Sequence, residues 1–84
     1  MKVLVTSIGS TQFDGEAVRV TAPGAAGVFT VLPYHSQLVA ALKAGTLTVE
    51  SPDGTTQDFD IASGVLTTNG EEVVVLGLPQ SGGV

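Results

Sequence analysis

Hydrophobic and polar residues alternate along most of the chain. Val3 and Val5 fall on one side of an extended run over residues 2–6. The same period of two recurs over residues 16–21, 46–50 and 55–61. Such alternation is typical of strands with one buried face, because successive side chains point to opposite sides. The run 73–78 is apolar on both faces apart from Gly77, and it therefore predicts a more fully buried strand.

Glycine and proline separate these runs. The longest stretch free of both is 34–44, so at most one short helix fits. Ser51-Pro52-Asp53-Gly54 has the residue types of a β-turn, and Asn69-Gly70 is a preferred two-residue hairpin connection. Short strands with turns at this spacing predict an all-β fold, a small antiparallel β-sandwich over residues 1–78. Residues 79–84 are expected to form a flexible tail.

The charge balance excludes several classes of partner. Three basic residues stand against eight acidic ones among 84, a net charge of −5. Nucleic acid is a poor partner, because phosphate binding needs several Lys or Arg side chains on one face. Anionic lipid is disfavoured for the same reason, and no apolar stretch approaches the roughly 18 residues of a transmembrane helix. We therefore expect no direct insertion into lipid.

Residues for catalysis or metal binding are scarce. His35 is the single histidine, there is no cysteine, and no Gly-x-Ser-x-Gly motif surrounds a serine. Asp58 and Asp60 supply two carboxylates on one strand face, whereas a calcium site normally takes six to eight oxygens. Gly24-Ala25-Ala26-Gly27 lacks the Gly-Lys-Ser/Thr of a phosphate loop. We expect no catalytic residue, no metal and no cofactor; a hydrolase with His35 as base is the enzyme alternative.

The segment 28–35 is the least ordinary part of the chain. It holds two of the four aromatic residues, a proline and the histidine, directly after a glycine-rich turn. This composition suits either a core crossing between two sheets or a protein interface, where Phe, Tyr and Leu are common. The residues by themselves therefore favour a non-catalytic sandwich that binds another protein, and a free-standing adaptor is one form of it.

A family resemblance extends over about residues 2–77 and rests on five motifs in order. They are Phe13-Asp14-Gly15-Glu16 with Val20-Thr21-Ala22-Pro23-Gly24, Gly27-x-Phe29-x-Val31-Leu32-Pro33-x-His35, Leu42-Lys43-x-Gly45-x-Leu47, Phe59-x-x-x-x-Gly64-x-Leu66, and Asn69-x-x-x-Val73-x-Val75-Leu76. In this order and spacing they resemble the β-sandwich domain of the epsilon subunit of F-type ATP synthases.

The resemblance implies a sandwich of about ten strands, with a strand rather than a helix over residues 36–43. It implies a non-catalytic subunit of the central rotor stalk that links the gamma subunit to the polar loops of the c-ring. Such a subunit couples ion translocation to ATP synthesis without doing the chemistry. It would be peripheral to the bacterial inner membrane, on its cytoplasmic side.

Partner-facing residues can be carried across position by position. Those expected to face the c-ring are Gly27, Val28, Phe29, Pro33, Tyr34 and His35, and those expected to face gamma are Ser7, Leu38, Ala40 and Leu42. The family commonly has Glu, Gly and Gly where this chain has Val28, Thr30 and Tyr34. The missing carboxylate predicts a more apolar ring loop opposite Val28. Most members continue as a helical hairpin that restrains ATP hydrolysis and in some binds ATP, and the chain is expected to lack both functions.

Overall fold

A computed structural model describes residues 1–7, 10–33, 37–69 and 71–79, and these residues form eight strands. The strands are β1 (Lys2–Ser7), β2 (Ser10–Glu16), β3 (Arg19–Gly24), β4 (Gly27–Val31), β5 (Leu38–Leu42), β6 (Gly45–Glu50), β7 (Thr56–Thr68) and β8 (Glu72–Pro79). The all-β prediction is confirmed, and the described residues contain no helix that could cross a membrane. The count falls below ten partly because β7 is one strand of 13 residues.

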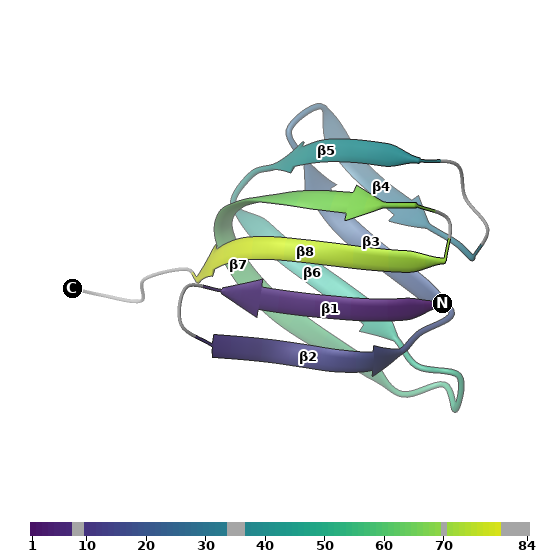
Figure 1. Ribbon diagram of the computed structural model, residues 1–84. Helices are drawn as coiled ribbons and strands as arrows, with labels where there is room; N and C mark the ends of the chain where they lie inside the picture. The colour runs from purple at the N-terminus through teal and green to yellow at the C-terminus, as the bar shows by residue number, and fades with distance from the viewer. Residues whose placement is uncertain (8–9, 34–36, 70, 80–84) are drawn as a thin grey trace.

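The strands make two layers that share β7 (Figure 1). From Thr56 to Ile61, β7 pairs with β6, and from Ser63 to Thr68 it pairs with β8 and β5. The register shifts between Ile61 and Ser63, where the strand passes from one layer to the other. We call the layer β2-β1-β8-β7-β5 the front sheet and the layer β4-β3-β6-β7 the back sheet.

The prediction of a wholly antiparallel sandwich is wrong for one pair. β1 and β8 run parallel, with Val3 opposite Val73 and Val5 opposite Val75. Antiparallel neighbours can be joined by a tight hairpin, whereas parallel neighbours need a long connection. β1 and β8 lie near opposite ends of the described chain, so everything between them serves as that connection.

The core consists of the inward-facing side chains of both sheets. Alternation identified them correctly in β1 and β6, where Val3, Val5, Leu47 and Val49 are all buried. The other buried apolar residues are Ala17, Val20, Ala22, Val31, Leu42, Ile61, Leu66, Val73 and Val75. Removal of each such side chain from water contributes about 1.5–3 kcal/mol for Val and Leu.

Two aromatic rings close the core beside β2. Phe13 and Phe59 meet edge to face, with centroids 6.3 Å apart and an interplanar angle of 69°. This geometry places the positive edge of one ring against the negative face of the other. Both side chains are partly buried against the core, so they seal one side of the sandwich rather than filling its centre.

The predicted turn at residues 51–54 is present, and the second predicted turn falls in the connection of residues 69–71 between β7 and β8. In the β6–β7 turn, Ser51 N donates to Thr55 O at 2.8 Å, Gly54 N donates to Ser51 O at 2.9 Å, and Gly54 has a φ of 89°. In the β7–β8 connection, Asn69 Oδ1 accepts from the backbone N–H groups of Glu71 and Glu72 at 3.1 and 2.9 Å. Gly70 and residues 80–84 of the expected tail lie outside the described residues.

Candidate functional site

The outer face of the back sheet is polar, and its side chains interact with one another. Thr48 Oγ1 donates to Asp58 Oδ1 at 2.8 Å, and Thr46 Oγ1 donates to Asp60 Oδ1 at 3.3 Å. Arg19 Nη1 lies 3.5 Å from Glu50 Oε1 on the same face. Asp58 and Asp60 are therefore carboxylates of a wet face, as predicted. Within the described ranges, no three His, Cys, Asp or Glu side chains are grouped so that they could hold a metal ion.

The outer face of the front sheet is apolar over β1, β8, β7 and β5, whereas β2 at its edge adds the exposed carboxylates Asp14 and Glu16, the register partners of Leu4 and Lys2. Two rows of side chains cross it, and successive members are register partners: Leu4, Val74, Thr67 and Val39 in one row, and Thr6, Leu76, Val65 and Ala41 in the other. We call Leu4, Val39, Ala41, Val65, Val74 and Leu76 the outer apolar face. Val39 is 75% exposed and Leu76 is 52% exposed. The expectation that the run 73–78 is buried on both sides is therefore wrong, since Val74 is only half-buried and Leu76 is exposed on the outer side of β8.

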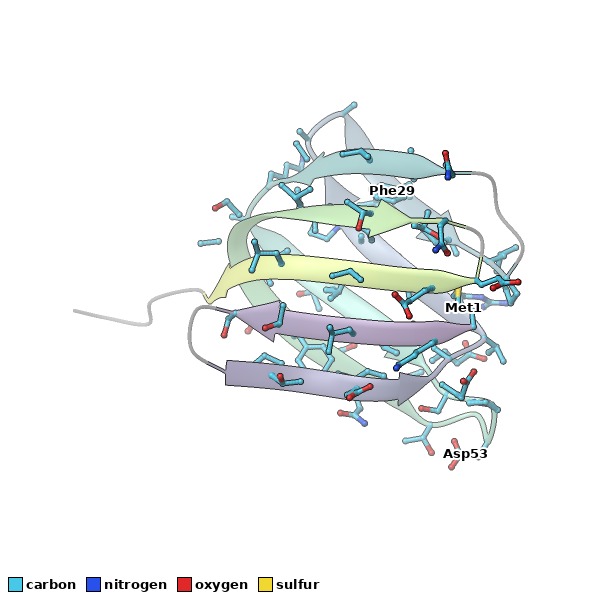
Figure 2. The ribbon with its side chains drawn as sticks, in the orientation of Figure 1. Met1, Phe29 and Asp53 are labelled. Carbon is cyan, nitrogen blue, oxygen red and sulfur yellow. The ribbon has the colours of Figure 1, made fainter. Side chains whose placement is uncertain are left out.

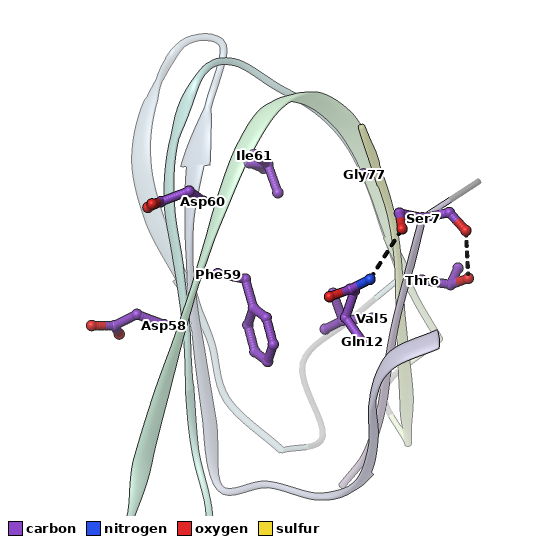
Figure 3. Close-up of a pocket in the computed structure, with 9 residues that line it drawn as sticks. All are labelled: Val5, Thr6, Ser7, Gln12, Asp58, Phe59, Asp60, Ile61 and Gly77. Atoms are coloured by element: carbon purple, nitrogen blue, oxygen red, sulfur yellow. Dashed lines mark hydrogen bonds between the residues drawn. The ribbon is translucent and has the colours of Figure 1, made fainter. Parts of the chain in front are cut away.

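One open side of the sandwich lies between β2 and β7 and contains a hollow of about 230 Å³. Figure 3 shows Phe59 and Ile61 directed into it and Asp58 and Asp60 directed away. Gln12 Nε2 donates to Ser7 Oγ at 3.2 Å at its wall. Because the two lining carboxylates point outward and bond to threonines, this hollow offers no acid–base pair for catalysis.

The other open side lies between β4 and β5 and contains two adjoining hollows of about 220 Å³ each. They share Phe29 and Ala40, so we treat them as one β4–β5 groove. Its lining residues are Gly24, Ala25, Ala26, Gly27, Phe29, Thr30, Leu38, Ala40 and Ala41. None of these side chains is ionisable, in contrast to the lining of the β2–β7 hollow.

The β4–β5 groove is closed at one end by backbone hydrogen bonds. Ala25 N donates to Ala41 O, and Lys43 N donates to Pro23 O, both at 2.9 Å. Gly24 and Leu42 are register partners at the same corner. An added Cβ at Gly24 would lie 2.6 Å from Gly27 O, so the corner requires glycine there. These contacts fix the β3–β4 hairpin against the end of β5.

The residues expected to face the c-ring do not share one environment. Gly27 and Val28 are exposed at the start of β4, with Val28 72% exposed and Gly27 at a φ of 137°. Phe29 turns inward, packs against the core and lines the β4–β5 groove. Pro33 is half-buried beyond the end of β4. Tyr34 and His35 lie outside the described residues.

The residues expected to face gamma do not form one surface. Ser7 is buried beside the β2–β7 hollow, whereas Leu38 and Ala40 are half-buried and line the β4–β5 groove on the opposite open side. Leu42 is 5% exposed and belongs to the core, which removes it from the surface of this domain. Alternation along β5 directs these residues inward and leaves Val39 and Ala41 on the outer side.

Sequence reasoning missed the outer apolar face. The sequence places Val39 and Leu76 only within the expected strands 36–43 and 73–78, and Val65 lies in none of the expected strands. The signal that identifies them is an apolar residue at consecutive positions, as in Leu38-Val39, Val65-Leu66 and Val75-Leu76. One member of each pair lies in the core or packs against it, so the other must be exposed or covered by something else.

Among the described residues, the one charged group with a marked electrostatic perturbation lies away from the apolar surfaces described above. The backbone N–H of Thr55 donates to Asp53 Oδ1 at 3.0 Å, and this hydrogen bond lowers the pKa of the Asp53 carboxyl. Figure 2 shows Asp53 in the β6–β7 turn, on the side of the molecule opposite Phe29. Its perturbation therefore serves the turn and not a binding site.

Curated relatives match most of the chain. The ATP synthase epsilon chain of Sulfurimonas denitrificans is 34% identical over 76 residues, which is 90% of this chain and 58% of that protein. The epsilon chain of Bordetella petrii is 36% identical over the same share of this chain and 54% of its own length. That of Chlorobaculum tepidum is 39% identical over 76% of this chain and 73% of its own. The chain thus spans little more than half the length of the first two relatives.

Solved structures share the fold. A chain of the Euglena gracilis mitochondrial ATP synthase, in a structure of OSCP, F1 and the c-ring, superimposes with a TM-score of 0.85 at 23% identity, covering 90% of this chain and 49% of that one. A chain from the central stalk and c-ring of the Tetrahymena thermophila mitochondrial ATP synthase gives 0.76 at 12% identity, with 92% and 62% covered. At these identities the likeness shows the fold alone.

The family match covers nearly all of the described residues. Residues 1–78 match the family described as "ATP synthase, Delta/Epsilon chain, beta-sandwich domain". The match includes all of β1 to β7 and β8 as far as Leu78. The chain belongs to the family of ATP synthase delta and epsilon chains, of which it forms the β-sandwich domain.

Proposed function

We propose that this chain is a non-catalytic rotor subunit of an F-type ATP synthase, holding the gamma subunit to the c-ring. The observation that carries the proposal is the outer apolar face, which is exposed in a sandwich whose other outer face is polar. Family membership and the c-ring and central-stalk assemblies named for the structural neighbours support it. In such an assembly the chain would be peripheral to the bacterial inner membrane, on its cytoplasmic side.

The gamma contact is assigned to the outer apolar face and the adjoining strand β5. Its two rows of register partners cross β1, β8, β7 and β5 without a charged side chain. Interface centres are depleted in charge, and a contiguous exposed apolar patch of this kind marks an interaction surface. Lys2 and Glu72 are register partners at one end of this face, where they supply a polar rim.

The c-ring contact is assigned to the β3–β4 hairpin with the segment 33–35. Ala25, Ala26, Gly27 and Val28 are all exposed and uncharged. A hairpin tip of this chemistry fits an apolar part of a ring loop and forms no ion pair. Ring binding through it should therefore depend only weakly on salt concentration.

The geometry needed for the rotor role is a stiff body with two contact surfaces. The hydrogen bonds from Ala25 to Ala41 and from Lys43 to Pro23 connect the ring-contact hairpin directly to the gamma-contact strand β5. The shared core and the continuous strand β7 hold the two sheets together. Transmission of rotation requires no acid, base or cofactor from this chain, and we assign it none.

Titration of the chain with the gamma subunit of the same organism tests the proposal. We expect a 1:1 complex at micromolar concentration or tighter by calorimetry, with amide NMR shifts concentrated on β1, β8, β5 and the second half of β7. No complex at micromolar concentrations, or shifts confined to the back sheet, would contradict it. Binding of a protein outside the ATP synthase at the outer apolar face, without binding of gamma, would instead support the adaptor alternative.

A further inference from the structure

Met1 is packed into one end of the sandwich, where β1 begins (Figure 2). Its side chain is 2% exposed and contacts the core, although Met1 as a whole is only half-buried. The side chain is therefore part of the packed interior, and the exposed atoms of Met1 belong to its main chain.

The α-amino group of Met1 has two partners. It donates a hydrogen bond to Ala17 O at 3.0 Å and lies 3.3 Å from Glu16 Oε2. Ala17 N donates to Met1 O at 2.9 Å, so Met1 and Ala17 exchange both hydrogen bonds of an antiparallel pair. These bonds extend the β1–β2 ladder by one pair beyond Lys2 and Glu16. Because Ala17 is fully buried, they fix the amine to a packed part of the chain.

This arrangement suits a free amine better than a peptide bond. An ammonium carries three protons and a charge, so it can bond to Ala17 O and to the Glu16 carboxylate together. Acylation of the amine, or a residue placed before Met1, leaves a neutral amide with a single N–H. Such an amide can donate to Ala17 O but loses the ion pair with Glu16.

The next residue cannot replace Met1. Lys2 N donates to Glu71 O at 3.0 Å, on the β8 side of β1 and away from Ala17, and the Lys2 side chain is exposed. Side chains of a strand point alternately to its two sides. A chain that began at residue 2 would therefore place no side chain where Met1 packs, and its ammonium would face the β7–β8 connection instead of Glu16.

We infer that this end of the sandwich is a site for a free N-terminal methionine, and that excision of Met1 or acylation of its amine weakens the fold. Excision hydrolyses the peptide bond between Met1 and residue 2, and water supplies the new carboxylate oxygen of methionine and the proton of the new amine. Aminopeptidases that remove an N-terminal methionine act where the next side chain is small, so the long side chain of Lys2 protects Met1. This inference does not depend on the proposed function.

Lys2→Ala tests the packing of Met1, because a small residue at position 2 permits excision during expression. Mass spectrometry identifies the chain that lacks Met1. The matched control is the same Lys2→Ala chain with Met1 kept, released from a carrier by a protease that leaves no residue before Met1. We expect the control to melt within about 4 °C of the parent chain. The excised chain should melt about 8 °C or more below the control, the scale expected on loss of a packed side chain from a domain of this size.

A second set of variants isolates the amine. A Gly-Ser extension before Met1 keeps the methionine side chain but converts the amine to an amide, and Glu16→Gln removes the same ion pair from its other side. We expect each change alone to lower the melting temperature by about 2–4 °C, because the Glu16 side chain is 67% exposed and the pair is partly screened. The two changes together should lower it no further than either alone, since they remove one interaction.

The remaining outcomes decide between the parts of the inference. Equal melting temperatures for the Lys2→Ala chains with and without Met1 would show that the Met1 side chain does not stabilise the fold. No loss in the extended chain, or additive losses with Glu16→Gln, would show that the site accepts an ordinary peptide and does not recognise a free amine. Failure of only the excised chain to fold would support the inference, because the control differs from it by Met1 alone.

Discussion

The two outer faces of the sandwich are built on the same alternation but carry different chemistry. On β6 of the back sheet, Thr46 and Thr48 donate hydrogen bonds to carboxylates of β7. On β8 of the front sheet, the outward positions are Val74 and Leu76. A threonine–carboxylate ladder can hydrogen-bond to water when it is exposed. Each Å² of apolar surface left exposed, in contrast, lacks about 25 cal/mol of the free energy that its burial would contribute.

The difference between the faces arises only at the outer positions of the two sheets. Both inner faces meet in one core, so inner positions are fixed by packing. The outer positions are free of that requirement, and their residue types differ: they are polar on the back sheet and mainly apolar on the front sheet, the side that we propose meets a partner. The following predictions test this contrast.

The largest difference in the free energy of unfolding is expected between substitutions on the inner and outer sides of β7. Leu66 is fully buried and its neighbour Val65 is 42% exposed on the outer apolar face. We expect Leu66→Ala to lower the free energy of unfolding by about 2–5 kcal/mol, through lost transfer energy and a cavity. Val65→Ala should lower it by less than about 1 kcal/mol. Urea denaturation measures both, and equal losses would mean that β7 does not have the described orientation.

The back-sheet ladder should contribute modestly to stability. Thr48→Val removes the 2.8 Å hydrogen bond to Asp58 and keeps a β-branched side chain of similar shape. Because both groups lie on a solvated face, we expect a loss of about 0.5–1 kcal/mol in the free energy of unfolding. Gamma affinity should be unchanged. A loss of gamma binding in this variant would show that gamma contacts the back sheet rather than the outer apolar face.

A charge at the tip of the β3–β4 hairpin should leave the free energy of unfolding nearly unchanged. Val28 is 72% exposed, so Val28→Glu should change the free energy of unfolding by less than about 0.5 kcal/mol. A change of several kcal/mol would show that Val28 packs in the folded chain. If the c-ring contact is apolar, the same variant should weaken ring binding and make it sensitive to salt.

The smallest effect concerns the β6–β7 turn. The Thr55 N–H holds the pKa of the Asp53 carboxyl below the ordinary value of 3.8. A lowered folded-state pKa means that the stabilisation is complete above the unfolded-state pKa and is lost as pH falls through the folded-state value. Carboxyl NMR titration should give a midpoint below 3.8 for Asp53. A midpoint at or above that value would show that the hydrogen bond is absent in solution.

Local pattern was sufficient for much of the fold. The alternation in β1 and β6 predicted which side chains are buried, because a strand with one covered face repeats every two residues. Ser51-Pro52-Asp53-Gly54 predicted the β6–β7 turn, since Pro and a glycine at positive φ suit it. The parallel pairing of β1 with β8 was not predictable in the same way, because no local motif records which distant strands become neighbours.

The candidate site was harder to predict, for a physical reason. An apolar run such as that in β8 has the same sequence whether its second face is covered by the same chain or by a partner. Leu76 therefore looked buried, although it is 52% exposed. In β5, the residues that the resemblance assigns to gamma are on the inward side of the strand, and Leu42 is buried in the core. Only the register of the whole front sheet distinguishes Val39 and Ala41 from Leu42.

The most direct test places the same charge on each outer face and measures gamma affinity. Val39→Lys acts on the outer apolar face at a side chain that is 75% exposed, and Thr46→Lys acts on the exposed ladder of the back sheet. Both variants should remain folded. We expect Val39→Lys to weaken gamma binding about 30-fold or more, the scale of a hot-spot loss near 2 kcal/mol, and Thr46→Lys to leave it unchanged. Equal affinities for the two variants, or a larger loss in Thr46→Lys, would contradict the assignment of the apolar face to gamma.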